Sequence, residues 1–285
     1  MSNQAQALAG DREFQFSNHD FEKVRDYVKA QTGINLSDAK KQLVYGRLAR
    51  RLRELSMTSF ADYLHHVQHN DSSELVNFIN AITTNLTSFF RENHHFEYLK
   101  SEAIPRLLKE NQHTRRIRIW SAGCSTGEEP YSIAITLRES IPSIDSWDVK
   151  ILATDLDTNV LAHGKNGVYD EERIAALSPQ RKKRWFRRGK GEHAGTVRVD
   201  PSLRDLITFK QLNLMKPWPM KGPFDLMFCR NVVIYFDKPT QRILFDRYAD
   251  ILRPDGNIFL GHSESMFKVS ERFKLIGNTI YQRTS

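Results

Sequence analysis

The chain has 285 residues, of which 40% are hydrophobic and 27% charged, with a formal net charge of +8 and a pI near 9.4. These values are ordinary for a globular protein with one large or two modest domains. No stretch approaches the roughly 18 apolar residues of a membrane span, and the first residues lack the blocks of a signal peptide. We therefore expect a cytoplasmic protein without membrane insertion. The positive charge indicates an anionic partner, which is nucleic acid, lipid or an acidic protein surface.

Residues 1–84 are predicted to form a helical N-terminal domain. Ser17 and Asp20 have the spacing of a capping box, and Gly33 is placed to end the helix that they begin. The later helices are expected over the ranges 37–55, 59–69 and 72–84.

The helix expected over 37–55 separates an apolar stripe from a basic one. The residues predicted to be buried recur at helical spacing: Val44, Leu48, Leu52 and Leu55. Three arginines lie on another side: Arg47, Arg50 and Arg53. This basic side is either a docking surface for an acidic partner or merely a solvated helix face.

From residue 85 onward the pattern changes to strand-like runs that are mostly separated by helical stretches. The runs are Ile117–Trp120, Val149–Thr154, Ile207–Gln211, Phe224–Cys229 and Asn257–Gly261. Such alternation is typical of a doubly wound, largely parallel sheet with helices on both faces. The sequence thus predicts an α/β domain over 85–285, with a turn at 252–256 before the last run.

Residues 178–205 interrupt this alternation. They combine a very basic stretch, Arg181–Arg184, with Gly189, Gly191 and Gly195 around short β-prone pieces. The segment is predicted to be a small antiparallel insertion, and the alternative is a solvated loop.

The first predicted strand leads into a glycine-containing turn, which is a candidate nucleotide-binding turn. Only Gly123 and Gly127 are present, so the turn lacks the three glycines of a dinucleotide fingerprint. Glu128 and Glu129 follow directly and would repel a pyrophosphate at the start of the next helix. A cofactor that has a cationic amino-acid end and no phosphate, such as S-adenosylmethionine, suits this turn better.

The second predicted strand ends in Asp155. In a doubly wound sheet this position faces a cofactor ribose. A carboxylate there can accept hydrogen bonds from both ribose hydroxyl groups. The alternative for Asp155 is a helix N-cap or a turn residue.

Three segments resemble the chemotaxis protein methyltransferase (CheR) family: Thr83–Glu92, Ala122–Ser132 and Phe228–Phe236. The resemblance runs from about Phe16 to the C-terminus and implies a Rossmann-like methyltransferase domain behind an all-α domain. It also implies a set of S-adenosylmethionine contacts: Asn85, Thr87, Arg91, Glu128, Asp155, Asn213, Leu214, Arg230 and Asn231. No metal is expected, because His65 and His69 have helical ligand spacing but no third ligand.

The implied reaction is esterification of glutamate side chains in the cytoplasmic signalling domain of methyl-accepting chemoreceptors. Glutamate is already ionised at pH 7, so no general base is required. Arg91 is the candidate for holding the attacking carboxylate, and Tyr235 is a candidate hydrogen-bond donor to it. We expect a monomer.

Two other functions remain open. The high pI and the basic helix suit a nucleic-acid methyltransferase. However, Arg230, Asn231 and Val232 stand where enzymes that methylate exocyclic amines typically carry Asn/Asp-Pro-Pro-Tyr, so nucleic acid is not the expected partner. The third possibility is a noncatalytic adaptor that binds S-adenosylmethionine as a signal.

Two receptor-docking surfaces are hypothesised. The first is the basic helix side with Arg47, Arg50 and Arg53, which would meet the acidic methylation helices. The second is suggested by the family resemblance, since some members tether a receptor's C-terminal tail at a small sheet in this place. Its residues would be Arg188, Gly189, Lys190, Gly191 and Gly195.

Overall fold

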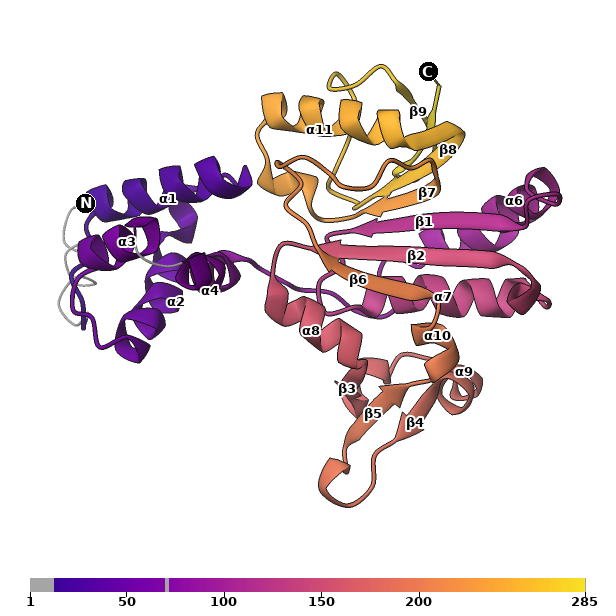
Figure 1. The fold of residues 1–285 in the computed structure, drawn as a ribbon, viewed down its shortest axis with the longest axis horizontal. Coiled ribbons are helices and arrows are strands. Elements are labelled where there is room, and N and C mark those ends of the chain that lie inside the picture. The colour runs from indigo at the N-terminus through magenta and orange to yellow at the C-terminus, as the bar shows by residue number, and fades with distance from the viewer. Residues whose placement is uncertain (1–12, 70–71, 285) are drawn as a thin grey trace, which may run out of the picture. The chain divides into compact units, whose positions relative to one another are not determined.

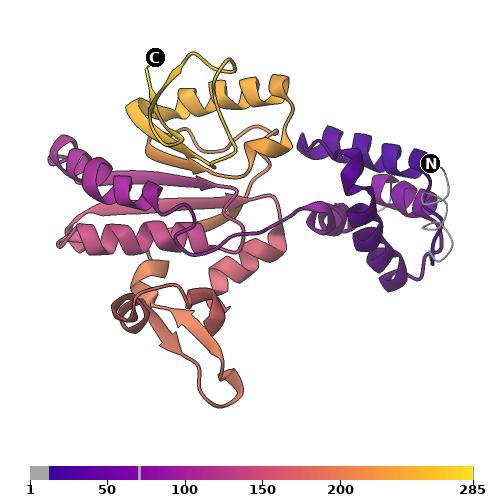
Figure 2. The same cartoon turned by 180° about the vertical axis from the view of Figure 1, so that it is seen from behind.

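The computed structural model describes residues 13–69 and 72–284. The first 12 residues of the predicted helical domain and Ser285 therefore lie outside the described residues. The chain divides into two compact units, Met1–Thr84 and Asn85–Ser285, which Figures 1 and 2 draw from opposite sides.

The first helix of the N-terminal unit, α1 (Asn18–Thr32), has the predicted capping box. The Ser17 hydroxyl accepts a hydrogen bond from the Asp20 backbone N–H at 3.1 Å, and the Asp20 carboxylate accepts one from the Ser17 N–H at 2.8 Å. At the other end Gly33 has φ of 77°, a left-handed conformation that glycine adopts without strain. Both ends of the helix are confirmed.

The other elements of this unit are η1 (Asp38–Lys40), α2 (Lys41–Glu54), α3 (Phe60–His69) and α4 (Ser72–Ile82). Val44, Leu48 and Leu52 of α2 are buried as predicted, but Leu55 is 36% exposed. The prediction for Leu55 was wrong because α2 ends at Glu54, which leaves Leu55 at the C-cap rather than on the buried stripe.

An arginine of α2 also lies inside the unit. Arg51 Nη2 lies 2.6 Å from Glu74 Oε2, and the Tyr63 hydroxyl donates to Glu74 Oε1 at 2.8 Å. Glu74 is only 4% exposed. Separating α2 from α4 would leave the buried Glu74 charge without its cation, which is energetically costly. The pair of Arg51 and Glu74 therefore holds α2 against α4.

The second unit contains a seven-stranded sheet in the order β6-β2-β1-β7-β8-β10-β9. Its strands are β1 (Arg116–Ala122), β2 (Asp148–Asp155), β6 (Ile207–Gln211), β7 (Phe224–Cys229), β8 (Leu252–Leu260), β9 (Phe273–Gly277) and β10 (Ile280–Arg283). The first five are parallel to one another, and β10 is antiparallel to β8 and β9. The predicted doubly wound sheet is confirmed.

Helices cover both faces of this sheet. They are α5 (His94–Tyr98), π-helical η2 (Leu99–Ala103), α6 (Ile104–Glu110), α7 (Glu128–Ser140), α8 (Thr158–Asn166) and α11 (Lys238–Ile251). Phe228 of β7 stacks on Phe96 of α5, whereas its neighbour Cys229 lies 3.1 Å from the Tyr248 hydroxyl of α11. Successive strand residues point to opposite faces, so α5 and α11 cover different sides. Within residues 13–69 and 72–284, no helix is both long enough and apolar enough to span a bilayer.

The last parallel strand begins earlier than predicted. The turn expected at 252–256 belongs to β8, where the pairing with β7 shifts register and Asp255 has φ of 59°. The turn-forming residues therefore bend a continuous strand, which is the role of a β-bulge, and do not precede it.

A separate three-stranded antiparallel sheet has the order β3-β5-β4, and Figure 1 shows it projecting beside the main sheet. Its elements are β3 (Val168–Asp170), η4 (Glu171–Ile174), α9 (Pro179–Trp185), β4 (Phe186–Arg188), η5 (Gly191–His193), β5 (Thr196–Val199) and α10 (Pro201–Arg204). The predicted range 178–205 missed β3, because three residues are too short to carry a strand pattern.

Candidate functional site

The turn between β1 and α7 is held close to two neighbouring strands. The backbone N–H groups of Gly123 and Cys124 both donate to Thr154 O at the end of β2, at 2.8 and 2.9 Å. Gly123 has φ of 82°, and a Cβ added there would lie 2.3 Å from a methyl group of Val232, after β7. Only glycine allows this approach, so the ends of β1, β2 and β7 meet at one place.

Asp155 ends β2 at this place and is 9% exposed. Its two oxygens accept hydrogen bonds from the backbone N–H groups of Ser125 (2.8 Å) and Asp157 (3.0 Å). Burial outweighs these bonds and raises the pKa of the Asp155 carboxyl to about 6. Each oxygen keeps a lone pair for a further donor, so the carboxylate can receive two hydroxyl groups.

The helix N-cap is the neighbouring Asp157, whose Oδ1 accepts from Asn159 N and Val160 N at the start of α8. Its other oxygen accepts from the Asn85 side-chain amide at 2.8 Å. The Asn85 carbonyl in turn accepts from the Ser125 hydroxyl at 3.0 Å. Asn85 is thereby placed beside Asp155, although 70 positions separate them in the sequence.

Two consecutive glutamates begin α7, and both are buried. Glu128 is 0% exposed, pairs with the Arg173 guanidinium and accepts from the Thr126 hydroxyl at 2.6 Å. Glu129 is 8% exposed and accepts from the Ser121 hydroxyl at 2.7 Å and from Arg230 Nη1 at 3.2 Å. Burial raises the pKa of the Glu129 carboxyl, and the Arg230 charge opposes that rise.

Arg230, which follows β7, is the central cation of the site and is 7% exposed. Its guanidinium lies 3.2 Å from Glu129 and 3.3 Å from Glu92, and it also donates to the Arg91 carbonyl. Burial by itself raises the pKa of Glu92, but a 2.8 Å bond from His262 and the Arg230 charge lower it to about 2. Glu92 is therefore ionised at any physiological pH.

The loop after β7 is fixed by one buried carboxylate. Glu264, 4% exposed, accepts from the backbone N–H groups of Asn231 (2.8 Å), Val232 (2.8 Å), Ile234 (3.1 Å) and Gly261 (2.6 Å). Asn231 has φ of 58°, a conformation that these bonds stabilise. Tyr235 lies half-buried in the 3₁₀ helix η6 (Val233–Tyr235) that ends this loop.

The remaining predicted contacts lie in the segments beside these. Arg91 is half-buried, and its Nη1 donates to the Leu86 carbonyl at 2.9 Å. The Thr87 carbonyl accepts from Arg173 at 3.1 Å. After β6, Asn213 Oδ1 accepts from Met215 N at 2.9 Å, and the Leu214 carbonyl accepts from Arg247 at 2.5 Å.

The structure thus joins the 85–92 segment, the turn after β1, Asp155 and the loop after β7. It places Arg188 and its neighbours on the separate small sheet, and Arg47, Arg50 and Arg53 in the other unit. Sequence reasoning missed five further residues: Glu92, Glu129 as an Arg230 partner, Arg173, His262 and Glu264. Glu92 was within a quoted motif, but Arg173, His262 and Glu264 gave no signal, because their partners are distant in the sequence.

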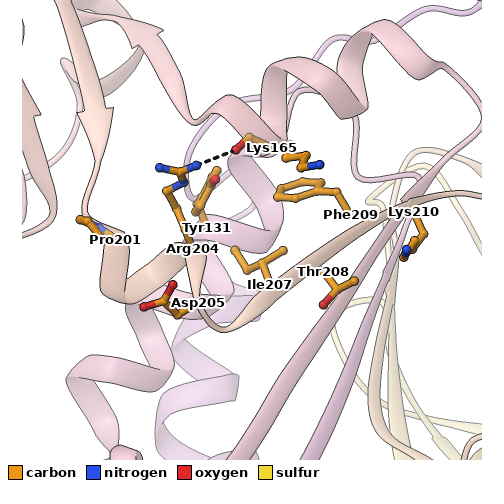
Figure 3. A pocket seen from close by; sticks show the side chains of 9 residues that line it. All are labelled: Tyr131, Lys165, Pro201, Arg204, Asp205, Ile207, Thr208, Phe209 and Lys210. Carbon is orange, nitrogen blue, oxygen red and sulfur yellow. Dashed lines mark hydrogen bonds between the residues drawn. The ribbon is translucent and has the colours of Figure 1, made fainter.

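A surface pocket of about 460 Å³ lies elsewhere, along the outer edge strand β6. Figure 3 shows its lining and the bond from Arg204 to the Lys165 carbonyl. The lining residues are Tyr131, Lys165, Pro201, Arg204, Asp205, Ile207, Thr208, Phe209 and Lys210. None of them is a predicted site residue.

The charges at the strand ends fit a cationic ligand. Glu92, Glu128, Glu129, Asp155 and Asp157 bring five carboxylates, whereas Arg91, Arg173 and Arg230 bring three guanidinium groups. The surplus is negative, which favours an amino group or a sulfonium and disfavours phosphate. In the described part of the chain, no group of three or more His, Cys, Asp or Glu side chains is arranged to hold a metal ion.

Comparison with known proteins gives two family matches. Residues 85–282 match the family model described as "CheR methyltransferase, SAM binding domain". Residues 19–83 match "CheR methyltransferase, all-alpha domain".

Similar proteins extend over almost the whole chain. Chemotaxis protein methyltransferase 2 of Pseudomonas aeruginosa is 48% identical over 95% of this chain and 95% of its own length. The chemotaxis protein methyltransferase of Escherichia coli is 44% identical over 93% of this chain and 91% of its own. A probable chemotaxis protein methyltransferase of Rhizobium etli is 42% identical over 90% and 97%.

The raised pKa of Asp155 predicts a pH dependence of cofactor binding. The predicted ribose contact would need the ionised Asp155 carboxylate as a double acceptor, and the free protein protonates this carboxylate as the pH falls through about 6. The affinity for S-adenosylhomocysteine, measured by calorimetry, should therefore fall below pH 6, by at most about tenfold per pH unit. Asp155→Asn should bind more weakly at pH 7 and lose this slope. An unchanged slope in Asp155→Asn would assign it to another group and refute the role of Asp155.

Proposed function

Because the chain belongs to the CheR methyltransferase family, we propose that it transfers the methyl group of S-adenosylmethionine to glutamate side chains of chemoreceptors. The product is a glutamyl methyl ester. The observation that carries the proposal is the group of buried carboxylates beside the carboxyl ends of β1 and β2: Glu128, Glu129 and Asp155. Arg230 joins Glu129 to the 85–92 segment.

Nine residues are proposed to hold the cofactor: Asn85, Thr87, Arg91, Glu128, Asp155, Asn213, Leu214, Arg230 and Asn231. Asp155 would accept the ribose hydroxyls, and the surplus negative charge of the site would attract the cationic end. When bound, S-adenosylmethionine supplies an electrophilic methyl group, and its sulfur takes the electron pair of the S–C bond. Burial raises the pKa of the Asp155 and Glu129 carboxyls, and a cationic ligand would stabilise their ionised forms, which supports this fit.

The chain's own part in the reaction is to orient the attacking carboxylate. Glutamate has an ordinary pKa of about 4.3, so it arrives ionised and no proton has to be removed. Arg91 is proposed to bind one carboxylate oxygen. Its bond to the Leu86 carbonyl fixes the guanidinium while other N–H donors stay on the same planar group. Tyr235 is proposed to donate a hydrogen bond to the same carboxylate.

Replacing Arg91 tests this assignment. Arg91→Lys keeps the charge but loses the fork, so kcat/KM for a receptor cytoplasmic fragment should fall about a hundredfold. Transfer from methyl-tritiated cofactor, counted as base-labile label in protein, measures it. Arg116→Lys, at the exposed start of β1, should match wild type.

The same assay separates the other functions. Label in RNA or DNA would support a nucleic-acid methyltransferase, and tight S-adenosylhomocysteine binding without turnover would support an adaptor. An Arg91→Lys enzyme with wild-type kcat/KM would contradict the role of Arg91.

The basic side of α2 is proposed to dock the acidic methylation helices of a receptor. Arg50 and Arg53 support it, since their side chains are 78% and 56% exposed, although each also pairs with a glutamate, Glu54 at 3.0 Å and Glu13 at 3.1 Å. Arg47 instead donates to three carbonyls at the end of α4: Ala81 (3.3 Å), Ile82 (2.8 Å) and Thr83 (2.6 Å). Arg47 thus satisfies orphan carbonyls of that helix, and the docking proposal depends mainly on Arg50 and Arg53.

Charge reversal at Arg53 tests this surface. Arg53→Glu should raise KM for the receptor fragment about fivefold at low salt, because an exposed attraction becomes a repulsion, and the effect should shrink at high salt. Lys23→Glu, an equal charge reversal at an exposed position of α1, is the control and should leave KM unchanged. Equal increases in both variants would mean that only the overall charge matters.

The small antiparallel sheet is proposed to bind a receptor's C-terminal tail as an added strand at the edge of β4. Gly189 N donates to Thr196 O and Asp200 N to Trp185 O, so odd-numbered residues of β4 face β5. By alternation, the N–H and C=O groups of Arg188 point to the open edge. Arg188 is 77% exposed and pairs with Glu171 at 2.5 Å.

A pair of substitutions at Arg188 separates backbone pairing from charge. Arg188→Pro removes the edge N–H and should weaken binding of an acidic tail peptide about tenfold or more, measured by calorimetry. Arg188→Ala keeps the N–H and should have a smaller effect. Cofactor affinity should stay at the wild-type value in both. Normal peptide binding by Arg188→Pro would exclude strand addition at β4.

A further inference from the structure

Arg173 lies in η4, between β3 and α9, and its side chain is 39% exposed. Its Nη2 donates both to Glu128 Oε1 and, at 3.1 Å, to the Thr87 carbonyl. One guanidinium therefore contacts two residues that are proposed to bind the cofactor. Nothing in the sequence pattern or in the proposed reaction has given Arg173 a role.

The backbone around Arg173 is itself anchored. Glu171 N donates to the Gly195 carbonyl at 2.9 Å, and the preceding strand β3 pairs with β5. The small sheet therefore fixes the position from which Arg173 extends. A guanidinium group that extends from an anchored backbone loses less conformational entropy when it binds two acceptors. This suits a residue that positions neighbouring groups.

Glu128 depends on this contact because its side chain is completely buried. Its Oε2 accepts from the Thr126 hydroxyl at 2.6 Å, and Arg173 is the cation on its Oε1. A buried carboxylate without a cation either takes up a proton or moves toward water. Arg173 thus determines the direction in which the Glu128 carboxylate points.

Arg230 repeats the same arrangement at the next glutamate. It pairs with Glu129 and donates to the Arg91 carbonyl, as Arg173 pairs with Glu128 and donates to the Thr87 carbonyl. Two guanidinium groups therefore connect the first turn of α7 to the 85–92 segment. Their contacts in that segment are the carbonyls of Thr87 and Arg91, which are four residues apart.

We propose that Arg173 is a positioning residue for the cofactor: it orients the Glu128 carboxylate and fixes the Thr87 backbone before the cofactor binds. The inference depends on the proposed cofactor contacts of Glu128 and Thr87. Arg173 acts on cofactor affinity and does not touch the attacking glutamate. Its loss therefore changes the dissociation constant and leaves the methyl-transfer step near normal once the cofactor saturates.

The test uses Arg173→Lys and Arg173→Met in the full chain. The dissociation constant of S-adenosylhomocysteine, measured by calorimetry, should rise about tenfold in Arg173→Lys and further in Arg173→Met. With saturating cofactor, kcat for a receptor fragment should stay within about twofold of wild type. Millimolar methylguanidine should restore part of the affinity of Arg173→Met, because the site is partly open to solvent.

Arg272→Met is the matched control. Arg272 Nη1 also donates to a carboxylate, Asp250 at 2.7 Å, and to a backbone carbonyl, Asp246 at 3.1 Å, and its side chain is 31% exposed. Removing it should leave the affinity for S-adenosylhomocysteine unchanged. If Arg272→Met weakens binding as much as Arg173→Met, the effect is general destabilisation and the proposal fails.

A double-mutant cycle with Glu128→Gln separates positioning from a structural role. The loss caused by Arg173→Lys should be much smaller in the Glu128→Gln background, because the neutral amide needs no cation. Additive losses, or a wild-type dissociation constant in Arg173→Lys, would overturn the proposal. If wild type binds S-adenosylhomocysteine but does not methylate the receptor fragment, the proposed substrate is wrong while the binding test of Arg173 still stands.

Discussion

The buried guanidinium of Arg230 is the interaction on which the site depends. It lies between Glu92 and Glu129 and also donates to the Arg91 carbonyl, so one cation joins β7, α7 and the 85–92 segment. Each partner in this group is costly to bury alone, since a buried charge without its counterion destabilises the fold by several kcal/mol. The three chain segments are therefore held in one arrangement. The proposed cofactor-binding residues on these segments are fixed relative to one another as a result.

Around this cation the site is built more from backbone constraints than from flexible side chains. Gly123 brings the turn after β1 against Val232, and Glu264 gathers four N–H groups that shape the loop after β7. Asp155 is held by two backbone donors. Groups fixed in this way need little rearrangement when a ligand arrives, which would favour the proposed methyl transfer without a general base.

Some of the chain's arginines stabilise the fold from within, and others contribute positive charge to the surface. Arg47, Arg51, Arg173 and Arg230 bind carbonyls or carboxylates within their own units. Arg50, Arg53 and Arg188 also pair with carboxylates, those of Glu54, Glu13 and Glu171, but more than half of each of these arginine side chains is exposed. Net charge therefore overstates the surface available to an acidic partner. The residues that remain exposed are the ones on which the docking proposals depend.

The sequence by itself determined the features that depend on local chemistry. The capping box at Ser17, the stop at Gly33 and the parallel strands beginning with β1 and β2 follow from neighbouring residues and from periodicity, and the structure confirms them. The family resemblance on three motifs is also a property of the sequence, and the family matches confirm it. The positions of the proposed cofactor contacts came from that resemblance.

Only the tertiary structure decided which charges meet. Arg173 binds Glu128 and Thr87, and His262 binds Glu92. These partners are too far apart in the sequence for helix or strand periodicity to predict the contacts. Tertiary structure likewise turned Arg47 from the predicted basic face toward the end of α4, exposed Leu55 and added the three-residue β3 to the small sheet. The physical reason is common to all of these: pairing of distant groups depends on where packed helices and strands bring them, whereas caps and periodic stripes depend on residues a few positions apart.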